Sequence, residues 1–451
     1  MTRTLGLSNR QTVPEESLYS GIWLRWSALS EAERVVCAGF ALLPVWWVLG
    51  WSSLLLFLAL GIVAWDVRRH GSVQLGRPGP AVIAAAAFGF YVLVSVMLRT
   101  PKLNVGPIFS TITTWTSFAF LLWYIESNRI RVRPRVVAWA CGAAVVQMLL
   151  FWLVVHFVFH EPYFSPPRSL IGLVTDRGER YIRGAGNRNY LIPYWVGDKG
   201  FAGLVRFSFF FHGPEAFATV AGFMALLALD LKRRLWSVLL FSACVFLLLL
   251  SGTRSVWLAF PAVLAARYLL TYGRAWGAAA LLGLLAVASF AVLSVPPLTD
   301  ALLNASTGTV EAAGSFRADS TELRAKIYRR TLERFDEEPL FGHGVPGPNV
   351  VPGFKYDTVY GPGTHSFLLG TLLYRNGLVG TGIFVIFWAS LILSFTRAGP
   401  AKPLCCLLAP LLFTLTFCVM ELESVVVLPL LLVCAVLYES ESIPVPGERN
   451  A

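Results

Sequence analysis

Long apolar runs separated by polar connections dominate the hydrophobic pattern of the chain. Repeated runs stay apolar over about 17 to 25 residues, the length that a helix needs to cross a bilayer. The runs do not alternate between apolar and polar positions, so a strand barrel is excluded. The pattern therefore predicts an all-α polytopic integral membrane protein with about twelve transmembrane helices.

The chain divides into seven segments that alternate between membrane and polar stretches. They are an N-terminal interfacial segment (1–33), helices one to five (34–158), a first large loop (159–208), helices six to nine (209–295), a second large loop with an amphipathic helix (296–365), helices ten to twelve (366–439) and a tail (440–451). The individual spans are expected at approximately 34–48, 50–66, 80–98, 106–125, 135–158, 209–230, 235–250, 255–272, 275–295, 366–386 or a little later, 404–420 and 422–439.

Basic residues are concentrated in alternate connections between the expected spans. The connections "DVRRHGSVQLGR", "ESNRIRVRPR", "LKRR", "RYLLTYGR" and "RAGPAK" each carry Arg or Lys. The tight turns at Leu49–Trp51 and Glu421–Glu423 carry neither. Because cytoplasmic connections are enriched in positive charge, the basic set and both termini are expected in the cytoplasm. Both large loops then lie on the outer face.

Composition agrees with this class, since 56% of the residues are hydrophobic and 14% are charged. The formal net charge of +11 would suit a nucleic-acid binder, but its distribution follows the membrane connections, so we expect no nucleic-acid partner. All seven cysteines fall inside apolar runs and lack metal-ligand spacing. We interpret them as small hydrophobic residues and expect no metal and no cofactor.

We expect no cleavable signal peptide, because the N-terminal residues are polar until an apolar run begins near Val35. The stretch "ESLYSGIWLRWSALSEAER" could form an amphipathic helix along the membrane surface. Its apolar side would comprise Leu18, Ile22, Trp23, Trp26 and Leu29. A simple N-terminal extension is the alternative interpretation.

The first large loop carries more positive than negative charge. Its basic residues are Arg168, Arg177, Arg180, Arg183, Arg188, Lys199 and Arg206, against Glu161, Asp176, Glu179 and Asp198. Long loops cross the membrane regardless of charge, which is one explanation. The other is that the loop binds an anionic, lipid-linked substrate.

The second large loop contains an amphipathic segment at residues 319–338. Its apolar face at helical periodicity comprises Leu323, Ile327, Tyr328, Thr331, Leu332 and Phe335. Arg324 lies within this face, and a guanidinium there needs a partner. That partner is either a salt-bridged residue of the loop or a phosphate or carboxylate of a ligand.

Two further polar groups lie at the outer ends of expected spans. Arg254 of "SGTRSVWLAF" marks either a functional site or a side chain that snorkels to the headgroups. In "RFSFFFHGPEAF", Arg206 opens a span that Gly213 and Pro214 break early, with His212 and Glu215 at the break. Such a break lines a wet cavity or is an ordinary proline kink with a His–Glu pair.

The stretch "DEEPLFGHGVPGPN" and the later "GTHSFLLG" complete the candidates. Gly342 and Gly344 belong to a turn-rich element whose exposed backbone N–H groups would suit a sugar or phosphate. His365 precedes the next span and is the histidine best placed for proton transfer, although a loop histidine can also be inert. The chain has no Walker A, HExxH or GxSxG motif, and the turn "LGWS" lacks the acidic residue of many metal-dependent membrane glycosyltransferases.

These elements in this order resemble the bacterial O-antigen ligase and O-antigen polymerase superfamily. The resemblance covers roughly residues 200–390 and rests on "RFSFFFHGP", "SGTR", "RAKIY", "PLFGHG" and "THSFLLGTLLYRNGLVG". It implies a GT-C-like transferase in the bacterial inner membrane with its active site facing the periplasm. The donor would be an undecaprenyl-diphosphate-linked glycan, and the reaction would need neither metal nor nucleotide sugar.

The resemblance also implies roles for individual residues. Arg206, Arg254 and Arg324 would face the diphosphate, and His365 would activate the acceptor hydroxyl. The sequence departs from the family pattern at three positions, because Glu215, Tyr328 and Ser366 stand where Asn, Trp and Asn are common. These departures put the identity of the acceptor in doubt more than the reaction.

The sequence and the resemblance together favour an inverting, ligase-like transfer to a sugar hydroxyl, with Arg206, Arg254 and His365 catalytic. Substrate contacts would come from Arg324, Tyr328, His212, Glu215, Gly342 and Gly344 as well as the two catalytic arginines. The acceptor would be a lipid A core or a nascent glycan, and membrane lipids would surround the protein. A polymerase with the same donor and a twelve-helix transporter of a lipid-linked or anionic substrate remain the alternatives.

Overall fold

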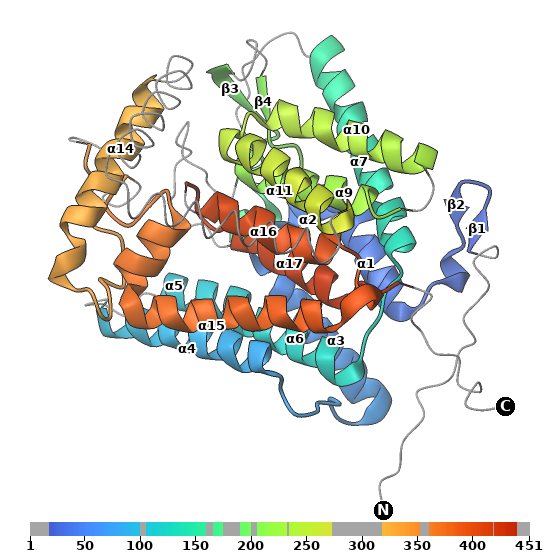
Figure 1. Cartoon of the computed structure of the whole chain (residues 1–451), viewed down its shortest axis with the longest axis horizontal. Helices are drawn as coiled ribbons and strands as arrows, with labels where there is room; N and C mark the ends of the chain where they lie inside the picture. Colours follow the sequence, from blue (N-terminus) through green and yellow to red (C-terminus); the bar gives the residue numbers. More distant parts are fainter. Residues whose placement is uncertain are drawn as a thin grey trace, which may run out of the picture.

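The computed structural model describes residues 18–99, 105–158, 166–174, 190–199, 205–231, 234–272, 318–351, 360–417 and 419–439. Within this part the chain is mostly helical, and two short hairpins are its only sheets (Figure 1). The expected span at 275–295 and the N-terminal residues 1–17 lie outside the described residues.

The first half of the chain forms a short hairpin followed by helices of different lengths. Its elements are β1 (Tyr19–Ser20), β2 (Trp23–Leu24), η2 (Trp26–Ala28), α1 (Glu31–Ala41), α2 (Leu43–Leu49), η3 (Trp51–Ser53), α3 (Leu54–His70), α4 (Pro80–Arg99), α5 (Val105–Thr111), the π-helical η4 (Ile112–Thr116), α6 (Ser117–Asn128), α7 (Pro134–Phe157) and α8 (Leu170–Val174).

The second half begins with an antiparallel hairpin and continues with the remaining helices. Its elements are β3 (Tyr194–Lys199), β4 (Val205–Phe207), α9 (Pro214–Ala228), α10 (Arg234–Ser251), α11 (Arg254–Tyr272), α14 (Ala318–Glu333), η6 (Phe335–Glu337), the π-helical η7 (Phe367–Arg375), α15 (Asn376–Arg397), η8 (Gly399–Ala401), α16 (Cys405–Phe417) and α17 (Ser424–Val436).

Helix α9 is the centre of the bundle. Every residue of α9 except Glu215 is buried, and α10, α11, α16, α17 and α7 pack against it. A helix that is apolar on all sides belongs in a core rather than at a surface. Its small residues let neighbours approach closely, since a Cβ on Gly222 would lie 2.8 Å from the Leu412 side chain. Outside this centre, α4 and α15 lie side by side along one edge (Figure 1).

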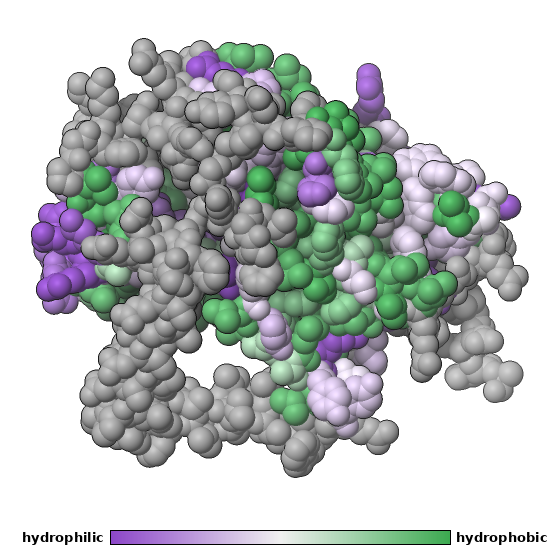
Figure 2. Space-filling model, turned by 90° about the horizontal axis from the view of Figure 1, so that it is seen from above, coloured by the Kyte–Doolittle hydropathy of each residue, from purple (hydrophilic) through white to green (hydrophobic). Residues whose placement is uncertain are grey.

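The face of the molecule in Figure 2 exposes many apolar residues, as expected for helices that face lipid. Figure 2 shows apolar residues over much of the visible described surface, with a strongly polar group at the left edge, the side on which Figure 1 draws α14. Five described helices are long and apolar enough to cross a membrane, and the bent pair α1–α2 would make a sixth. The long helices are Pro80–Arg99, Ile108–Asn128, Pro134–Phe157, Arg254–Tyr272 and Phe367–Arg397.

The predicted spans agree in position with the described helices. Apart from 275–295, each overlaps a helix or helix pair, although α9, α10, α16 and α17 are shorter than full spans. The last long span is longer than predicted, because η7 and α15 continue to Arg397. The membrane all-α class is therefore supported, while the number twelve and the GT-C-like core remain predictions.

The connections fall into two groups at opposite ends of the helices. At one end, the amide N–H of Gly76 donates to the Ser127 hydroxyl at 2.9 Å, and Val132 pairs with Leu437. At the other end, the Trp51 indole N–H donates to the carbonyl oxygen of Phe210 at 2.7 Å. The first group contains the connections that carry Arg or Lys, and the second contains the tight turns that carry neither. This grouping agrees with the predicted alternation, and the membrane side of each end remains a prediction.

The N-terminal interfacial helix is a wrong prediction. Residues 19–24 form the hairpin β1–β2 instead, with Gly21 at a φ of 64° in its turn. Leu18 and Leu29 are buried, whereas Ile22 and Trp23 are exposed, so the five apolar residues do not share one face. The two-residue turn Gly21–Ile22, with glycine at its first position, favours a hairpin over a helix.

Prolines set two helix boundaries differently from the prediction. Pro214 does not kink a span that has already begun but is the first residue of α9, where its missing N–H costs no hydrogen bond. Pro44 lies in the first turn of α2, and the pair α1–α2 is bent by 72° there.

In the second loop, the predicted amphipathic helix ends at Glu333, and Leu332 is exposed instead of packed.

The six cysteines in the described part of the chain, Cys37, Cys141, Cys244, Cys405, Cys406 and Cys434, are free and buried. This confirms their interpretation as small core residues. Cys418 lies outside the described residues.

Asp230 offers a test of the packing at the end of α9. Its carboxylate accepts hydrogen bonds from Arg267 at 2.6 Å and from the amide of Cys405 at 2.7 Å, and both charged side chains are largely buried. Asp230→Asn leaves Arg267 without its ion partner, so we expect a loss of about 3–5 kcal/mol in the free energy of unfolding. Thermal unfolding in detergent measures the loss.

The control for Asp230→Asn is Glu31→Gln. Glu31 pairs with Arg69 at 3.0 Å, but both side chains are more than half exposed. We expect a change below about 1 kcal/mol, because solvent screens such pairs. Equal losses in the two variants would show that burial does not make the Asp230–Arg267 pair more important than the exposed pair.

Candidate functional site

Arg206 is the buried centre of a polar cluster at the end of the molecule opposite the basic connections. It lies on β4, its Nε donates to the carbonyl oxygen of Ser251 at 3.0 Å, and its Nη2 lies 3.4 Å from the Glu215 carboxylate. Trp195 pairs with Arg206 across the β3–β4 hairpin. Ser251 ends α10 and Glu215 stands in the first turn of α9, so Arg206 joins three separate segments.

Gly252 makes room for the Arg206 side chain. Its φ is 61°, a conformation that residues with a side chain rarely adopt. A Cβ at this position would lie 2.8 Å from Cγ of Arg206 and 2.9 Å from its Nε. The "SGTR" and "RFSFFFHGP" motifs, which are separate in the sequence, therefore interlock through the contact between Gly252 and Arg206.

Two more arginines belong to the cluster, and Arg254 is the one that lies near the other two. Arg254 is the first residue of α11, and both Arg206 and Arg324 of α14 are near enough to act on it electrostatically. Within the part of the chain that the structure describes, neither Arg254 nor Arg324 has a hydrogen-bond or ion-pair partner. The cluster thus combines three guanidinium groups, and Glu215 is the acidic residue that pairs with one of them.

His365 lies at the edge of the same cluster. Burial lowers the pKa of its imidazole to about 4, with a further lowering by Arg324 and an opposing effect of Glu215. His365 therefore stands within the electrostatic range of Arg324 and Glu215, from α14 and α9. The imidazole is neutral at pH 7 and can accept a proton, which an imidazolium cannot do.

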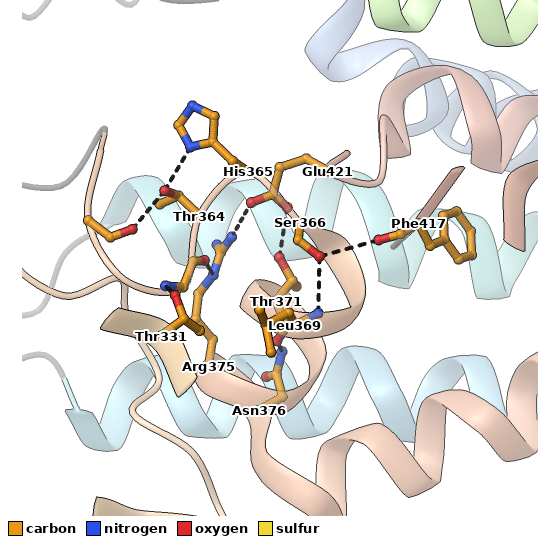
Figure 3. Close-up of polar contacts among 12 residues, drawn as sticks. Thr331, Thr364, His365, Ser366, Leu369, Thr371, Arg375, Asn376, Phe417 and Glu421 are labelled. Atoms are coloured by element: carbon orange, nitrogen blue, oxygen red, sulfur yellow. Dashed lines mark hydrogen bonds and ion pairs between the residues drawn. The ribbon is translucent and has the colours of Figure 1, made fainter. Parts of the chain in front are cut away.

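The backbone of His365 is held by contacts from other elements. Its φ of 65° is uncommon for a residue with a side chain. The Tyr328 hydroxyl of α14 donates to the carbonyl oxygen of His365 at 2.9 Å. Two residues earlier, Arg375 Nε donates to the carbonyl oxygen of Gly363 at 2.8 Å (Figure 3).

The turn between α16 and α17 braces this loop. Glu421 accepts from Arg375 and from the Thr371 hydroxyl, each at 2.8 Å (Figure 3). Glu423 is bonded to Nε2 of His212, which lies between Arg206 and Glu215 in the sequence. One short turn therefore ties the segment of His365 to the segment of Arg206.

Sequence reasoning missed Arg375, Glu421 and Glu423 as components of the site. The available signal is a pair of carboxylates, Glu421 and Glu423, in a two-helix turn that lacks Lys and Arg. Of the predicted residues, the structure brings together Arg206, Arg254, Arg324, Tyr328, Glu215 and His365, with His212 beside them.

The expectation that Gly342 and Gly344 present free N–H groups is wrong. Their amides donate to the carbonyl oxygens of Glu338 at 3.0 Å and Arg375 at 2.8 Å. A Cβ on Gly342 would lie 2.5 Å from the amide nitrogen of Gly377, so the glycine permits close packing against the end of η7. A contact of these glycines with a glycan remains a prediction.

The described residues contain no group of three or more His, Cys, Asp or Glu side chains that could hold a metal ion. The site instead combines the positive charges of its arginines with the imidazole of His365. Guanidinium groups bind phosphate oxygens through a planar, permanently charged fork, so the arrangement suits a phosphorylated ligand.

Residues 239–385 match the family described as Wzy_C, O-antigen ligase. The matched segment contains Arg254, Arg324, Tyr328 and His365, whereas Arg206 precedes it. The match confirms the resemblance to the O-antigen ligase and polymerase superfamily. It supports, together with the apolar helices, a membrane enzyme of that type. No curated protein matches the chain.

Gly252→Ala tests the interlock between the two motifs. The positive φ costs about 1–2 kcal/mol for a residue with a side chain, and the collision with Arg206 adds about 1–3 kcal/mol. Thermal unfolding should therefore show a larger loss than in Gly399→Ala. Gly399 has a φ of 57° but no neighbour within 4 Å of its added Cβ, so it isolates the backbone contribution.

A second comparison identifies the cause of the difference. When Arg206 is already truncated to Ala, the extra loss from Gly252→Ala should disappear, because the colliding atoms are gone. An extra loss that persists in this background would show that Gly252 does not serve the Arg206 side chain.

Proposed function

We propose that the protein is a metal-independent, inverting glycosyltransferase of the O-antigen ligase type. It transfers a glycan from undecaprenyl diphosphate, or a polyprenyl diphosphate of the same kind, to a sugar hydroxyl. In this proposal the site faces the periplasm, the protein spans the bacterial inner membrane, and both termini are cytoplasmic. The acceptor is a lipid A core or a nascent glycan.

The observation that carries the proposal is the excess of positive charge around Arg254. Three guanidinium groups share a neighbourhood in which Glu215 pairs with Arg206, and the described chain provides no ion partner for Arg254 or Arg324. A partly buried charge without a partner is costly. A diphosphate supplies the missing negative charge, and a lipid tail on that diphosphate would lie among the apolar helices.

The same arginines stabilise the departing group in the proposed reaction. As the bond between C1 of the donor sugar and the diphosphate oxygen breaks, its electron pair moves to the diphosphate. Arg254 and Arg324 lower the energy of this developing charge, because fixed cations act most strongly where charge grows. Arg206, held by Ser251 and Glu215, shapes the cationic wall.

His365 supplies the proton acceptor in this proposal. The acceptor hydroxyl attacks C1 from the side opposite the diphosphate, and its proton passes to the imidazole as the new C1–O bond forms. Tyr328 and the Arg375–Glu421 pair keep the loop of His365 in place. Proximity of base and cationic wall makes a single inverting displacement geometrically reasonable.

A reconstituted assay with one defined lipid-linked glycan tests the reaction class. We expect a glycan transferred to an added lipopolysaccharide core, or to a second lipid-linked glycan if the protein is a polymerase. Both products contain a new glycosidic bond and support the proposal. Movement of the lipid-linked glycan across the bilayer without a new bond would instead support a transporter.

Arg254→Gln and Arg324→Gln should each reduce transfer about 10²- to 10³-fold, which corresponds to about 2–4 kcal/mol of lost transition-state stabilisation. Initial rates with purified donor in detergent measure the effect. Arg330→Gln is the matched control, because Arg330 stands on the same helix but is exposed and lies 3.5 Å from Glu333. Transfer in both site variants at the control rate would refute the role of the cationic wall.

The pH dependence of transfer tests His365 and its surroundings. With a pKa of about 4, the imidazole loses its ability to accept a proton only as the pH falls toward 4, so activity should stay level from pH 7 to about 5. Arg324→Gln removes a repelling cation, stabilises the imidazolium and moves this acid limb to higher pH. Glu215→Gln removes an attracting carboxylate and moves it to lower pH.

The acid limb is read from the pH profile of kcat/KM, and Arg330→Gln should leave it unchanged. An identical acid limb in Arg324→Gln, Glu215→Gln and the unaltered protein would show that His365 does not govern proton transfer.

A further inference from the structure

A neutral imidazole can carry its proton on either ring nitrogen, and only the nitrogen without a proton can act as a base. The partner of one nitrogen decides which form is present. In His365, Nδ1 lies 2.9 Å from the hydroxyl oxygen of Thr364. The direction of this single hydrogen bond therefore determines which nitrogen faces the acceptor sugar with a lone pair.

The Thr364 hydroxyl has a single proton and can donate it either to His365 or to the carbonyl oxygen of Gly361. Its Oγ1 lies 2.7 Å from the carbonyl oxygen of Gly361, a buried residue, and a carbonyl can only accept. If the hydroxyl proton pointed at His365 instead, this carbonyl would lose that bond. A buried acceptor left unpaired costs about 1–3 kcal/mol. The proton therefore goes to Gly361, and the hydroxyl oxygen accepts from Nδ1–H of His365.

We propose that Thr364 is a positioning residue that holds His365 in the tautomer with Nδ1 protonated and Nε2 free to accept a proton. The inference deepens the proposed function, since it rests on His365 as the base of the transfer. Figure 3 shows the imidazole with one nitrogen directed at Thr364 and the rest of the ring pointing away from the drawn polar contacts. Within the described residues, Nε2 of His365 has no hydrogen-bond partner.

The arrangement also serves the product side of the reaction. When the acceptor hydroxyl gives its proton to Nε2, the ring becomes an imidazolium with a proton on both nitrogens. Nδ1–H continues to donate to Thr364, so no group has to reorient during the step. The ring of Tyr360 lies over the imidazole with centroids 5.6 Å apart and an interplanar angle of 22°, which fixes the plane in which Nε2 points.

Backbone strain supports a fixed geometry at this position. A side-chain-bearing residue at positive φ costs about 1–3 kcal/mol and persists only where its surroundings hold it. Here Tyr328 holds the carbonyl oxygen of His365, and Arg375 holds that of Gly363. The same strained loop places the Thr364 hydroxyl within reach of both Gly361 and the adjacent imidazole.

The charged and titratable groups that act on His365 are Arg324 and Glu215, while Tyr328 and Tyr360 contact it. Thr364 carries no charge. Replacing it therefore changes the tautomer balance without changing the electrostatic field, which separates this role from the pH effects of Arg324 and Glu215.

Thr364→Val removes the hydroxyl and keeps the shape of the side chain. We expect kcat of glycan transfer to fall about 10- to 100-fold, as when the group that orients a functional histidine is lost, with KM for the lipid-linked donor unchanged. Thr364→Ser retains the hydroxyl and should stay within about threefold of the unaltered protein. Thr396→Val is the control, because its hydroxyl donates only to a backbone carbonyl, that of Leu393.

Nitrogen-15 NMR of labelled histidine supplies a readout that does not need activity. The His365 signal, assigned by its loss in His365→Ala, should show a protonated Nδ1 in the unaltered protein and a mixture of tautomers in Thr364→Val. Thermal unfolding of Thr364→Val and Thr396→Val confirms that both variants are folded at the assay temperature.

The outcomes separate the two proposals. If His365→Ala transfers glycan normally, the base role fails, although the NMR signal can still show whether Thr364 sets the tautomer. If Thr364→Val keeps the unaltered kcat and the Nδ1-protonated signal, the Thr364 inference is overturned and the glycosyltransferase proposal stands. A Thr364→Ser variant as inactive as Thr364→Val would also overturn it, because the hydroxyl would not be the group that matters.

Discussion

The need of a buried guanidinium for negative charge is the constraint on which the polar end of the molecule depends. Arg206 meets this need within the chain, because it binds the Ser251 carbonyl and pairs with Glu215. Arg254 and Arg324 lie in the same electrostatic neighbourhood, and no partner for them stands in the described residues. Glu215 thus neutralises Arg206, whereas the charges of Arg254 and Arg324 are not neutralised within the described residues. This excess of positive charge favours the binding of an anionic ligand.

The remainder of the site is organised to keep that cluster and the histidine in register. Arg206 and His365 belong to segments far apart in the sequence, and the turn between α16 and α17 contacts both. Glu423 binds His212 on the Arg206 side, and Glu421 binds Arg375 on the His365 side. The two carboxylates are separated by one residue in this turn, and each binds a different segment. The turn therefore restricts both segments at once.

Unusual backbone conformations gather where these segments meet. Gly252 beside Arg206, Gly342 beside the end of η7, and His365 all have positive φ angles. At the two glycines the reason is close approach, since a Cβ would collide with Arg206 or with the backbone at Gly377. At His365 no glycine relieves the strain, so contacts from Tyr328 and from the Thr364 side must hold the loop.

Hydrophobic pattern alone determined the class of this protein, because run length and the absence of alternation depend only on the bilayer and on helix geometry. It placed most helices and, with residue types at short spacing, the arginines and His365. It did not predict the hairpin at 19–24 or the start of α9 at Pro214, although Gly21 and Pro214 are local signals for these two features. The partnership of Glu421 with Arg375, the collision space at Gly252 and the hydroxyl bonds of Thr364 were decided only by tertiary structure. These contacts join residues distant in sequence or depend on one backbone angle, and no local pattern of residue types encodes either.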